Sequence, residues 1–251
     1  METLAVEIQM LNLVSQTVWP PRRSVCDMSP PADSVRAPMP NADFFAALGF
    51  FIRRGFLDAR TCARLRAEVG AAPASAATVR TDDRTYDVDR STRSAAWANP
   101  APAAVELVEG RLRAVMPEVS RHYGVALTGL QPLQFLVYRQ EDFFQRHRDR
   151  GEGDDTPEFS RARRMAAVIF LNGEGDPSVS AGYRGGALTL DGLFEQPAAE
   201  TLAFPLEAEE GLLVTFPADV MHEVRPVEAG ERYTVVTWFE DRDSDRLTVA
   251  T

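Results

Sequence analysis

The sequence predicts a mainly β fold, a β-sandwich or jelly roll with N-terminal helices packed outside one sheet. Two stretches with helical spacing of apolar residues precede Gly124, and short apolar runs separated by turn residues follow it. Helices followed by many short strands are typical of these layered β folds. A chain of 251 residues with 45% hydrophobic composition is long enough for one sizeable core.

Residues 1–40 differ in composition from the rest of the chain. They contain six of the 17 prolines, including Pro20-Pro21 and Pro30-Pro31, and proline restricts φ and lacks a backbone donor. We therefore predict a mobile N-terminal extension over 1–40 and a single folded domain over 41–245. Met28 and Met39 are alternative starting methionines.

The net charge and the cysteine content indicate which binding partners and which cellular compartment to expect. The formal net charge is −10, whereas proteins that bind a phosphate backbone are usually basic over the binding face. Cys26 and Cys62 form no zinc-binding spacing and are too few for a disulfide framework. No apolar run reaches the length of a membrane span, and the N-terminus lacks the basic leader of a signal peptide. We predict a cytoplasmic protein without nucleic-acid or membrane partners.

The first helix is predicted from its cap and its spacing. A β-like run at 49–53 opens the domain. Asp58 then provides an N-cap for a helix that ends near Val69, where Gly70 terminates it. The apolar face of this helix contains Cys62, Leu65 and Val69.

A second helix is predicted over 100–123, with Asn99 as its N-cap and a kink at Pro117. Its apolar stripe consists of Val105, Val108, Leu112, Val115 and Val119. Between the two helices, the polar and charged segment 79–98 is expected to form a long loop or an irregular hairpin.

Six runs with β character follow Gly124. Turn sequences rich in glycine separate them, as at 173–177, 182–186 and 228–231. The predicted strands cover 133–138, 165–171, 187–190, 201–204, 212–216 and 233–239.

Three residues in the β-rich part have the chemistry of a metal site. His147 and Asp149 are two positions apart, and such residues point to the same side of an extended segment. His222 lies 73 residues after Asp149, just past the run 212–216, so a neighbouring strand can supply it as a third ligand. Two imidazoles and one carboxylate on one face of iron(II) leave three positions open for a co-substrate and dioxygen. An isolated His-x-Asp pair is nevertheless common by chance.

Arg232 adds a second signal, ten residues after His222 and at the start of the run 233–239. An arginine that points into a sandwich core needs an anion, and its planar guanidinium suits a carboxylate. A dicarboxylic 2-oxo acid that binds iron through one end presents a carboxylate at the other. The alternative is a surface arginine paired with Glu228 or Glu231.

This arrangement resembles the iron(II)/2-oxoglutarate-dependent dioxygenase superfamily, and most closely its prolyl 4-hydroxylase branch. That branch carries a tyrosine, eight residues and then HxD, as Tyr138 and His147 do here. A basic residue follows its distal histidine by ten positions and a tryptophan comes six residues later, matched by Arg232 and Trp238. An apolar strand ending in Leu-Asn, a Gly-Gly strand and a Phe-Pro pair match at 169–172, 185–190 and 216–217. The resemblance covers roughly 43–241.

The resemblance implies a double-stranded β-helix, which is a jelly roll with the metal at its open end. It implies Fe(2+) held by His147, Asp149 and His222, with no further catalytic residue expected, and 2-oxoglutarate as co-substrate. Ascorbate is a candidate reductant. The residues expected to contact 2-oxoglutarate are Arg232, Tyr138 and Thr234, and the candidate substrate-pocket residues are Trp238, Arg93 and Phe144. For Trp238, plain core packing is the alternative.

The implied reaction hydroxylates a C–H bond of an amino acid, a peptidyl residue or a related small metabolite, with succinate and CO2 as co-products. Two departures concern the family pattern: Glu141 replaces a frequent glycine, and Phe144 replaces a tyrosine that often binds the co-substrate. The substrate therefore need not be proline. The charged segments 79–98 and 150–164 are either solvated loops or lids whose arginines hold a substrate carboxylate.

Two other functions stay open at this point. A cupin-like module that binds or senses a metal without turnover would explain the three ligands but not the spacing of Arg232. A dioxygenase acting on nucleic-acid bases would share the whole pattern, and the acidic composition counts against it.

Overall fold

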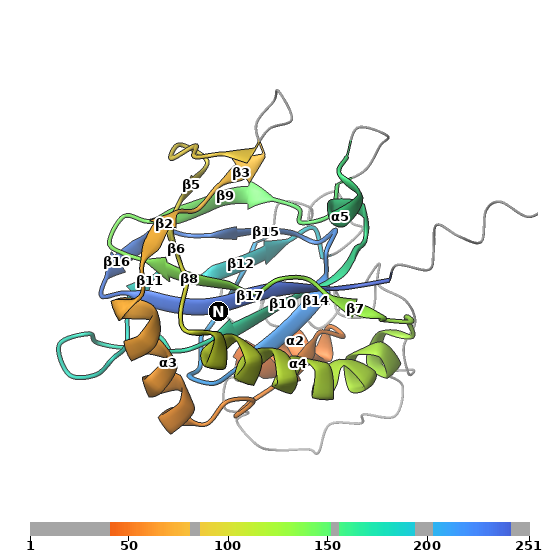
Figure 1. The fold of residues 1–251 in the computed structure, drawn as a ribbon, viewed down its shortest axis with the longest axis horizontal. Helices are drawn as coiled ribbons and strands as arrows, with labels where there is room; N and C mark the ends of the chain where they lie inside the picture. The colour runs from red at the N-terminus through yellow and green to blue at the C-terminus, as the bar shows by residue number, and fades with distance from the viewer. Residues whose placement is uncertain (1–40, 81–85, 152–155, 194–202, 242–251) are drawn as a thin grey trace, which may run out of the picture.

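The computed structural model describes residues 41–80, 86–151, 156–193 and 203–241 (Figure 1). Two antiparallel sheets face each other as a jelly roll. The predicted extension 1–40 and the first two residues of the predicted strand 201–204 lie outside the described residues. No helix in the described ranges is both long and apolar enough to cross a membrane.

The larger sheet has eight strands and supplies the central layer of the fold. Seven of them follow one path, and the eighth, β7 (Gly129–Leu130), pairs with β17 (Arg232–Glu240) beside that path. The order along the main path is β1 (Phe51–Arg53), β14 (Leu213–Pro217), β10 (Arg163–Phe170), β17 (Arg232–Glu240), β8 (Gln134–Tyr138), β6 (Ala96–Ala98) and β2 (Ala74–Ala76).

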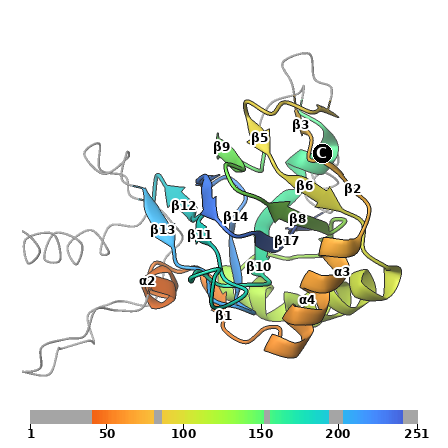
Figure 2. The same cartoon turned by 90° about the vertical axis from the view of Figure 1, so that its left-hand side faces the viewer.

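The smaller sheet has five strands and lies across the inner face of the larger one (Figure 2). Two short ribbons, β3 (Val79–Arg80) with β4 (Tyr86–Asp87) and β11 (Arg184–Gly185) with β16 (Val227–Ala229), complete the β structure. The order in the smaller sheet is β13 (Phe204–Leu206), β12 (Leu188–Asp191), β15 (Met221–Val224), β9 (Phe143–His147) and β5 (Arg93–Ser94).

Strand β10 explains why its sequence reads as one continuous apolar run. Met165, Ala167 and Ile169 belong to the core shared with the long helices, whereas Ala166, Val168 and Phe170 belong to the core between the sheets. Successive side chains of a strand point to opposite faces. Both faces of the larger sheet are therefore buried at this central strand, which explains the apolar residues at every position from Met165 to Phe170.

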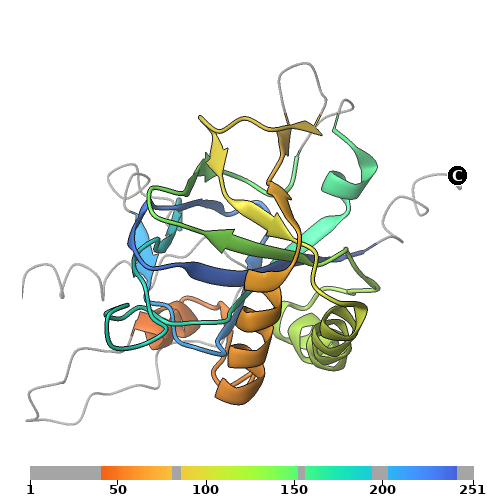
Figure 3. The same cartoon turned by 60° about the vertical axis from the view of Figure 1, so that its left-hand side comes forward.

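Helices α3 (Ala59–Ala71) and α4 (Pro102–Tyr123) cover the outer face of the larger sheet (Figure 3). Both predicted apolar faces are confirmed: Cys62, Leu65 and Val69 of α3 are buried, and so is the predicted stripe of α4 except Val105, which is partly buried against the same core. The short helix α2 (Asn41–Ala47) instead contacts β1 and β13, and its Phe45 joins the core between the sheets.

The helix ends show which capping signals decide the boundaries. Asp58 caps α3 as predicted, with its carboxylate accepting from the Thr61 backbone N–H. The prediction of Asn99 as the cap of α4 was wrong: the cap position is Ala101, and Pro102 is the first helical residue. Proline suits that first position because its fixed φ is helical and no N–H is needed there.

The segment 79–98 holds more strand than its polar sequence suggests. A hairpin of β3 and β4 was one of the two expected forms. In addition, β5 pairs with β9 and β6 pairs with β8, so this segment joins both sheets. The helix α5 (Glu158–Arg161) in the charged segment 150–164 was likewise not predicted.

Candidate metal centre

His147 and His222 lie on neighbouring strands of the smaller sheet. They are register partners, His147 at the end of β9 and His222 in β15. Asp149 follows two residues after β9, where its backbone N–H and that of Arg150 both donate to the Ala218 carbonyl, at 3.0 and 2.8 Å. The turn after β9 is thereby tied to the segment between β14 and β15, which brings the carboxylate to both imidazoles.

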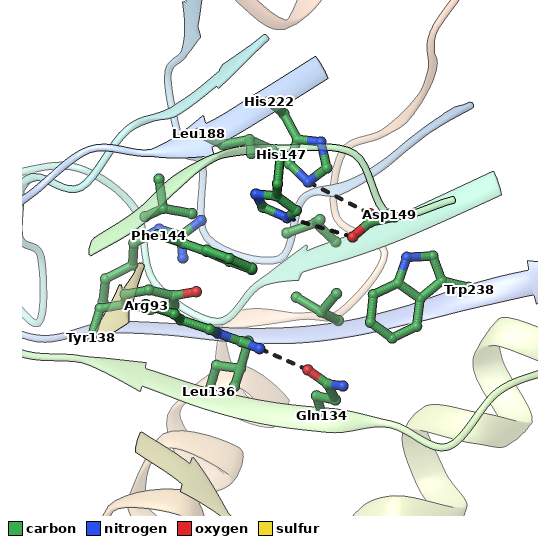
Figure 4. A pocket seen from close by; sticks show the side chains of 14 residues that line it. Arg93, Gln134, Leu136, Tyr138, Phe144, His147, Asp149, Leu188, His222 and Trp238 are labelled. Carbon is green, nitrogen blue, oxygen red and sulfur yellow. Dashed lines mark hydrogen bonds and ion pairs between the residues drawn. The ribbon is translucent and has the colours of Figure 1, made fainter. Parts of the chain in front are cut away.

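The three side chains converge on one point (Figure 4). Nε2 of His147 lies 3.6 Å from Oδ1 of Asp149, and Nε2 of His222 lies 3.5 Å from Oδ2. One ligand atom from each residue lies within 4.8 Å of the other two. Ligands around a single transition-metal ion have this mutual spacing, since each lies about 2.0–2.2 Å from the metal.

The backbone fixes the orientation of both imidazoles. Nδ1 of His147 lies 2.8 Å from the Gln145 carbonyl, and Nδ1 of His222 lies 2.9 Å from the Val220 carbonyl. A hydrogen on Nδ1 satisfies each carbonyl and leaves the Nε2 lone pair directed at the shared point. Such contacts set the tautomer and the ring orientation of histidine ligands.

Burial sets the charge of the site. Burial lowers the pKa of His222 to about 4, with a smaller contribution from His147, so the ring is neutral at physiological pH. Burial alone would raise the pKa of Asp149, but His222 and His147 together hold it well below its ordinary value. Two imidazole donors and an ionised carboxylate are the donor set that suits iron(II), and the residues present fit that ion.

A pocket opens beside the three candidate metal ligands and is lined by His147, Asp149 and His222. Arg232 is buried at the start of β17 and lines the same pocket. Only 2% of it is exposed, and no carboxylate of the described residues lies within ion-pair distance of it. Its Nη1 donates to Thr234 at 3.4 Å, and its Nε has no partner. Since the surface pairing with Glu228 or Glu231 does not form, the guanidinium stays free for an anion that enters the pocket.

Asn172 holds the backbone on both sides of Arg232, a role that the sequence did not reveal. Its amide donates to the Glu231 carbonyl at 2.7 Å, and its side-chain oxygen accepts from the Tyr233 N–H at 2.9 Å. The Leu-Asn pair that follows β10 therefore fixes the direction of Arg232 across the sheet.

All but one of the other predicted site residues line the pocket. Tyr138, the register partner of Arg232, lines it, and the guanidinium lies 5.1 Å from its ring. Trp238, Arg93 and Phe144 also line it. Thr234 does not; its described contact is the hydrogen bond from Arg232, so it supports the arginine rather than the pocket surface.

Arg163 connects Trp238 to the metal centre and was not singled out from the sequence. Its guanidinium lies 3.5 Å from the Trp238 ring centroid, and its Nη1 donates to the Asp149 carbonyl at 3.1 Å. Trp238 is therefore held between the core and this cation, and packing and pocket lining are both part of its role.

The two departures from the family pattern have structural counterparts. Glu141 adopts a φ of 67°, the left-handed conformation that glycine favours, so the turn is kept although the residue is not glycine. Phe144 stacks on His147 with ring centroids 3.6 Å apart. The aromatic ring of Phe144 thus supports a candidate ligand in place of a hydroxyl group.

Comparisons with known proteins place this geometry in context. Residues 133–240 match the family described as the 2OG-Fe(II) oxygenase superfamily. A prolyl-4-hydroxylase from Pseudomonas putida is 24% identical, with 80% of this chain and 97% of that chain covered and a TM-score of 0.57. A search of curated proteins found no significant match.

Two further solved structures share the fold. A prolyl hydroxylase from Trichoplax adhaerens, in complex with a hypoxia inducible factor oxygen degradation domain peptide fragment, is 18% identical over 83% of this chain and 91% of that chain, with a TM-score of 0.58. An oxidoreductase of the 2OG-Fe(II) oxygenase family from Burkholderia pseudomallei is 17% identical over 80% and 89%, with a TM-score of 0.52. At these identities the likeness establishes a shared fold.

Proposed function

We propose that this chain is a 2OG-Fe(II) oxygenase, because residues 133–240 match the model of that superfamily, and that it hydroxylates a C–H bond of an amino acid, a peptidyl residue or a related small metabolite. Its cofactors are Fe(2+) and 2-oxoglutarate. The observation that carries the proposal is the buried guanidinium of Arg232, which has no carboxylate of the described residues within ion-pair distance, in the pocket that also contains His147, Asp149 and His222.

The proposed roles follow from the chemistry of each side chain. His147, Asp149 and His222 hold the iron, and Arg232 binds the distal carboxylate of 2-oxoglutarate through charge-assisted hydrogen bonds. Bound iron(II) and 2-oxoglutarate supply the oxidising chemistry, in which dioxygen converts 2-oxoglutarate into succinate and CO2 and a substrate C–H bond into C–OH. The apolar walls exclude water and include Leu136, Val168, Leu188, Val224 and Val236.

The rival without turnover, a metal-binding module, gives no reason for an unpaired arginine beside the metal site. A site that only binds or senses a metal would gain stability from an apolar residue at position 232, because a buried guanidinium without a counter-charge is costly. The base dioxygenase is disfavoured by the net charge of −10.

Succinate formation tests the proposed function directly. The iron-loaded enzyme is expected to release succinate from 2-oxoglutarate above its background rate when a library of amino acids, peptides and small metabolites contains its substrate. Asp149→Gly is expected to abolish this increase, since the variant lacks the one carboxylate of the metal centre. The variant is expected to keep the fold. An active Asp149→Gly variant, or a wild-type protein that neither binds nor consumes 2-oxoglutarate, would contradict the proposal.

The domain boundary is a separate proposal: residues 1–40 are dispensable for folding and turnover, because their six prolines oppose regular structure. Deleting 1–40 is expected to leave the melting temperature and the rate of succinate formation nearly unchanged. Thermal unfolding and a turnover assay on the shortened and full chains check this. A large loss of either would show that the segment contributes to the domain.

A further inference from the structure

We propose that the substrate carries a free carboxylate and that Arg93 binds it. This inference rests on the proposed function and adds a substrate class to it. Arg93 lies in β5, opposite Phe144 of β9, and reaches the same pocket as the metal centre. It supplies a second buried cation there in addition to Arg232.

The contacts of Arg93 leave its charge without an acidic partner. Its Nη1 donates to the Thr78 carbonyl at 3.3 Å and its Nη2 to the side-chain oxygen of Gln134 at 3.4 Å, while its Nε has no partner. Both acceptors are neutral, both bonds are long, and no carboxylate in the described ranges forms an ion pair with this residue. Since only 8% of Arg93 is exposed, water cannot solvate the charge freely.

Arg93 lies close to the metal centre, separated from it by the ring of Phe144. Its guanidinium lies 4.6 Å from the Phe144 ring centroid, and the same ring stacks on His147. In Figure 4 the Phe144 ring lies between His147 and Arg93, and the Arg93 side chain extends below it toward Gln134. A carboxylate on Arg93 is therefore one aromatic ring away from a metal ligand, a separation that a small organic acid can span.

A count of formal charges leaves Arg93 uncompensated. Of the described pocket-lining residues, Arg93 and Arg232 are cations and Asp149 is an anion, and histidines that bind a metal ion do so as neutral imidazoles. Iron(II) and Arg232 together carry three positive charges, and Asp149 and 2-oxoglutarate together carry three negative charges, so these four cancel. Arg93 then needs one further negative charge, because an unpaired buried cation is costly.

The size of the missing charge favours a carboxylate. A carboxylate supplies one negative charge and matches the planar guanidinium, whereas a phosphate monoester would supply roughly −1.5 to −2 and overcompensate. An internal residue of a peptide has no such charge on its main chain. The two sources that fit are a free amino or other carboxylic acid and the C-terminal residue of a peptide.

Ligand pairs that differ only in this carboxylate test the proposal. The probes are the free amino acids, the same amino acids with the α-carboxylate replaced by an amide, and dipeptides ending in each amino acid. They are titrated anaerobically into protein loaded with iron(II) and 2-oxoglutarate, with the charge-transfer absorption of the bound co-substrate and tryptophan fluorescence as readouts. Wild type is expected to bind at least one acid at least ~30-fold more tightly than its amide. A response to dipeptides alone assigns the peptide C-terminus as the source.

Variants of Arg93 separate recognition from a structural role. Arg93→Met is expected to lose the preference for the acid over the amide and to keep its affinity for the amide, iron and 2-oxoglutarate. Arg93→Lys keeps the charge and is expected to retain part of the preference, which provides the test if the methionine variant is unstable. Arg90→Met, an exposed arginine of the same segment, is the matched control and should behave as wild type.

Three results would overturn the proposal: equal binding of acids and amides by wild type, an unchanged preference in both Arg93 variants, or the absence of any response to the acids and dipeptides. The proposed function fails in a different way, through the absence of a charge-transfer band when 2-oxoglutarate is added to the iron-loaded wild type. The two failures are therefore distinguishable in one titration series.

Discussion

Replacing His222 with alanine is expected to weaken iron(II) binding by more than about 100-fold, because even residues that only orient metal ligands typically contribute 10–100-fold to affinity. His222 is 6% exposed and lies opposite His147 in the register of β15 and β9. Its loss removes one of three converging donors, and the remaining His147 and Asp149 cannot enclose one face of the ion. His147→Ala is expected to have a comparable effect.

The third histidine of the chain provides the control. His122 is exposed on α4 and its Nε2 lies 2.8 Å from the Gly49 carbonyl, outside the pocket. Anaerobic titration with iron(II) should give the same stoichiometry of one ion per chain for His122→Ala as for wild type. Thermal unfolding in the absence of metal checks that all three variants fold. Tight iron binding by His222→Ala or His147→Ala would mean that the ion is held elsewhere.

The parts of the fold that sequence could predict are those encoded locally. Asp58 caps α3 through a bond to an N–H three residues away, and the apolar faces of both long helices follow from spacing alone. Strands β5 and β6 between these helices escaped prediction because their pairing depends on distant partners: Ala96 of β6 lies opposite Val137 of β8. A strand of two or three polar or small residues has no periodicity of its own.

In the candidate site, too, some residues could be predicted from local spacing and others could not. The spacing of His147, Asp149, His222 and Arg232 lies in the sequence, and the structure brings all four side chains to one pocket. The supporting residues could not be found in that way. Asn172 supports Arg232 from 60 positions away in sequence, and its role depends on the pairing of β10 with β17. Such contacts carry no local signal, because a buried asparagine and an exposed one look alike in sequence.

Arg232→Met is expected to weaken 2-oxoglutarate binding at least ~30-fold while iron binding persists. Removing one partner of a buried charge pair costs roughly 2–5 kcal/mol, and about 1.4 kcal/mol corresponds to a tenfold change in affinity. Methionine keeps most of the volume between Tyr138 and Phe170, whose rings lie 5.1 and 5.3 Å from the guanidinium carbon. The measurement is an anaerobic titration of the iron-loaded protein with 2-oxoglutarate, followed through the charge-transfer absorption of the complex.

A shorter 2-oxo acid without the distal carboxylate separates the two possible causes of such a loss. If Arg232 acts on that carboxylate, pyruvate should bind wild type and Arg232→Met about equally, whereas a general collapse of the pocket would weaken both ligands. Arg225→Met is the matched control, because Arg225 is exposed beside Glu223, just after β15, and is absent from the pocket lining. Wild-type affinity of Arg232→Met for 2-oxoglutarate would assign the anchor to another cation, and Arg93 and Arg164 would be the next to test. An anchor at Arg93 would also leave Arg232 without its counter-charge, so the same titration of Arg93→Met and Arg164→Met would then determine which cation binds the co-substrate.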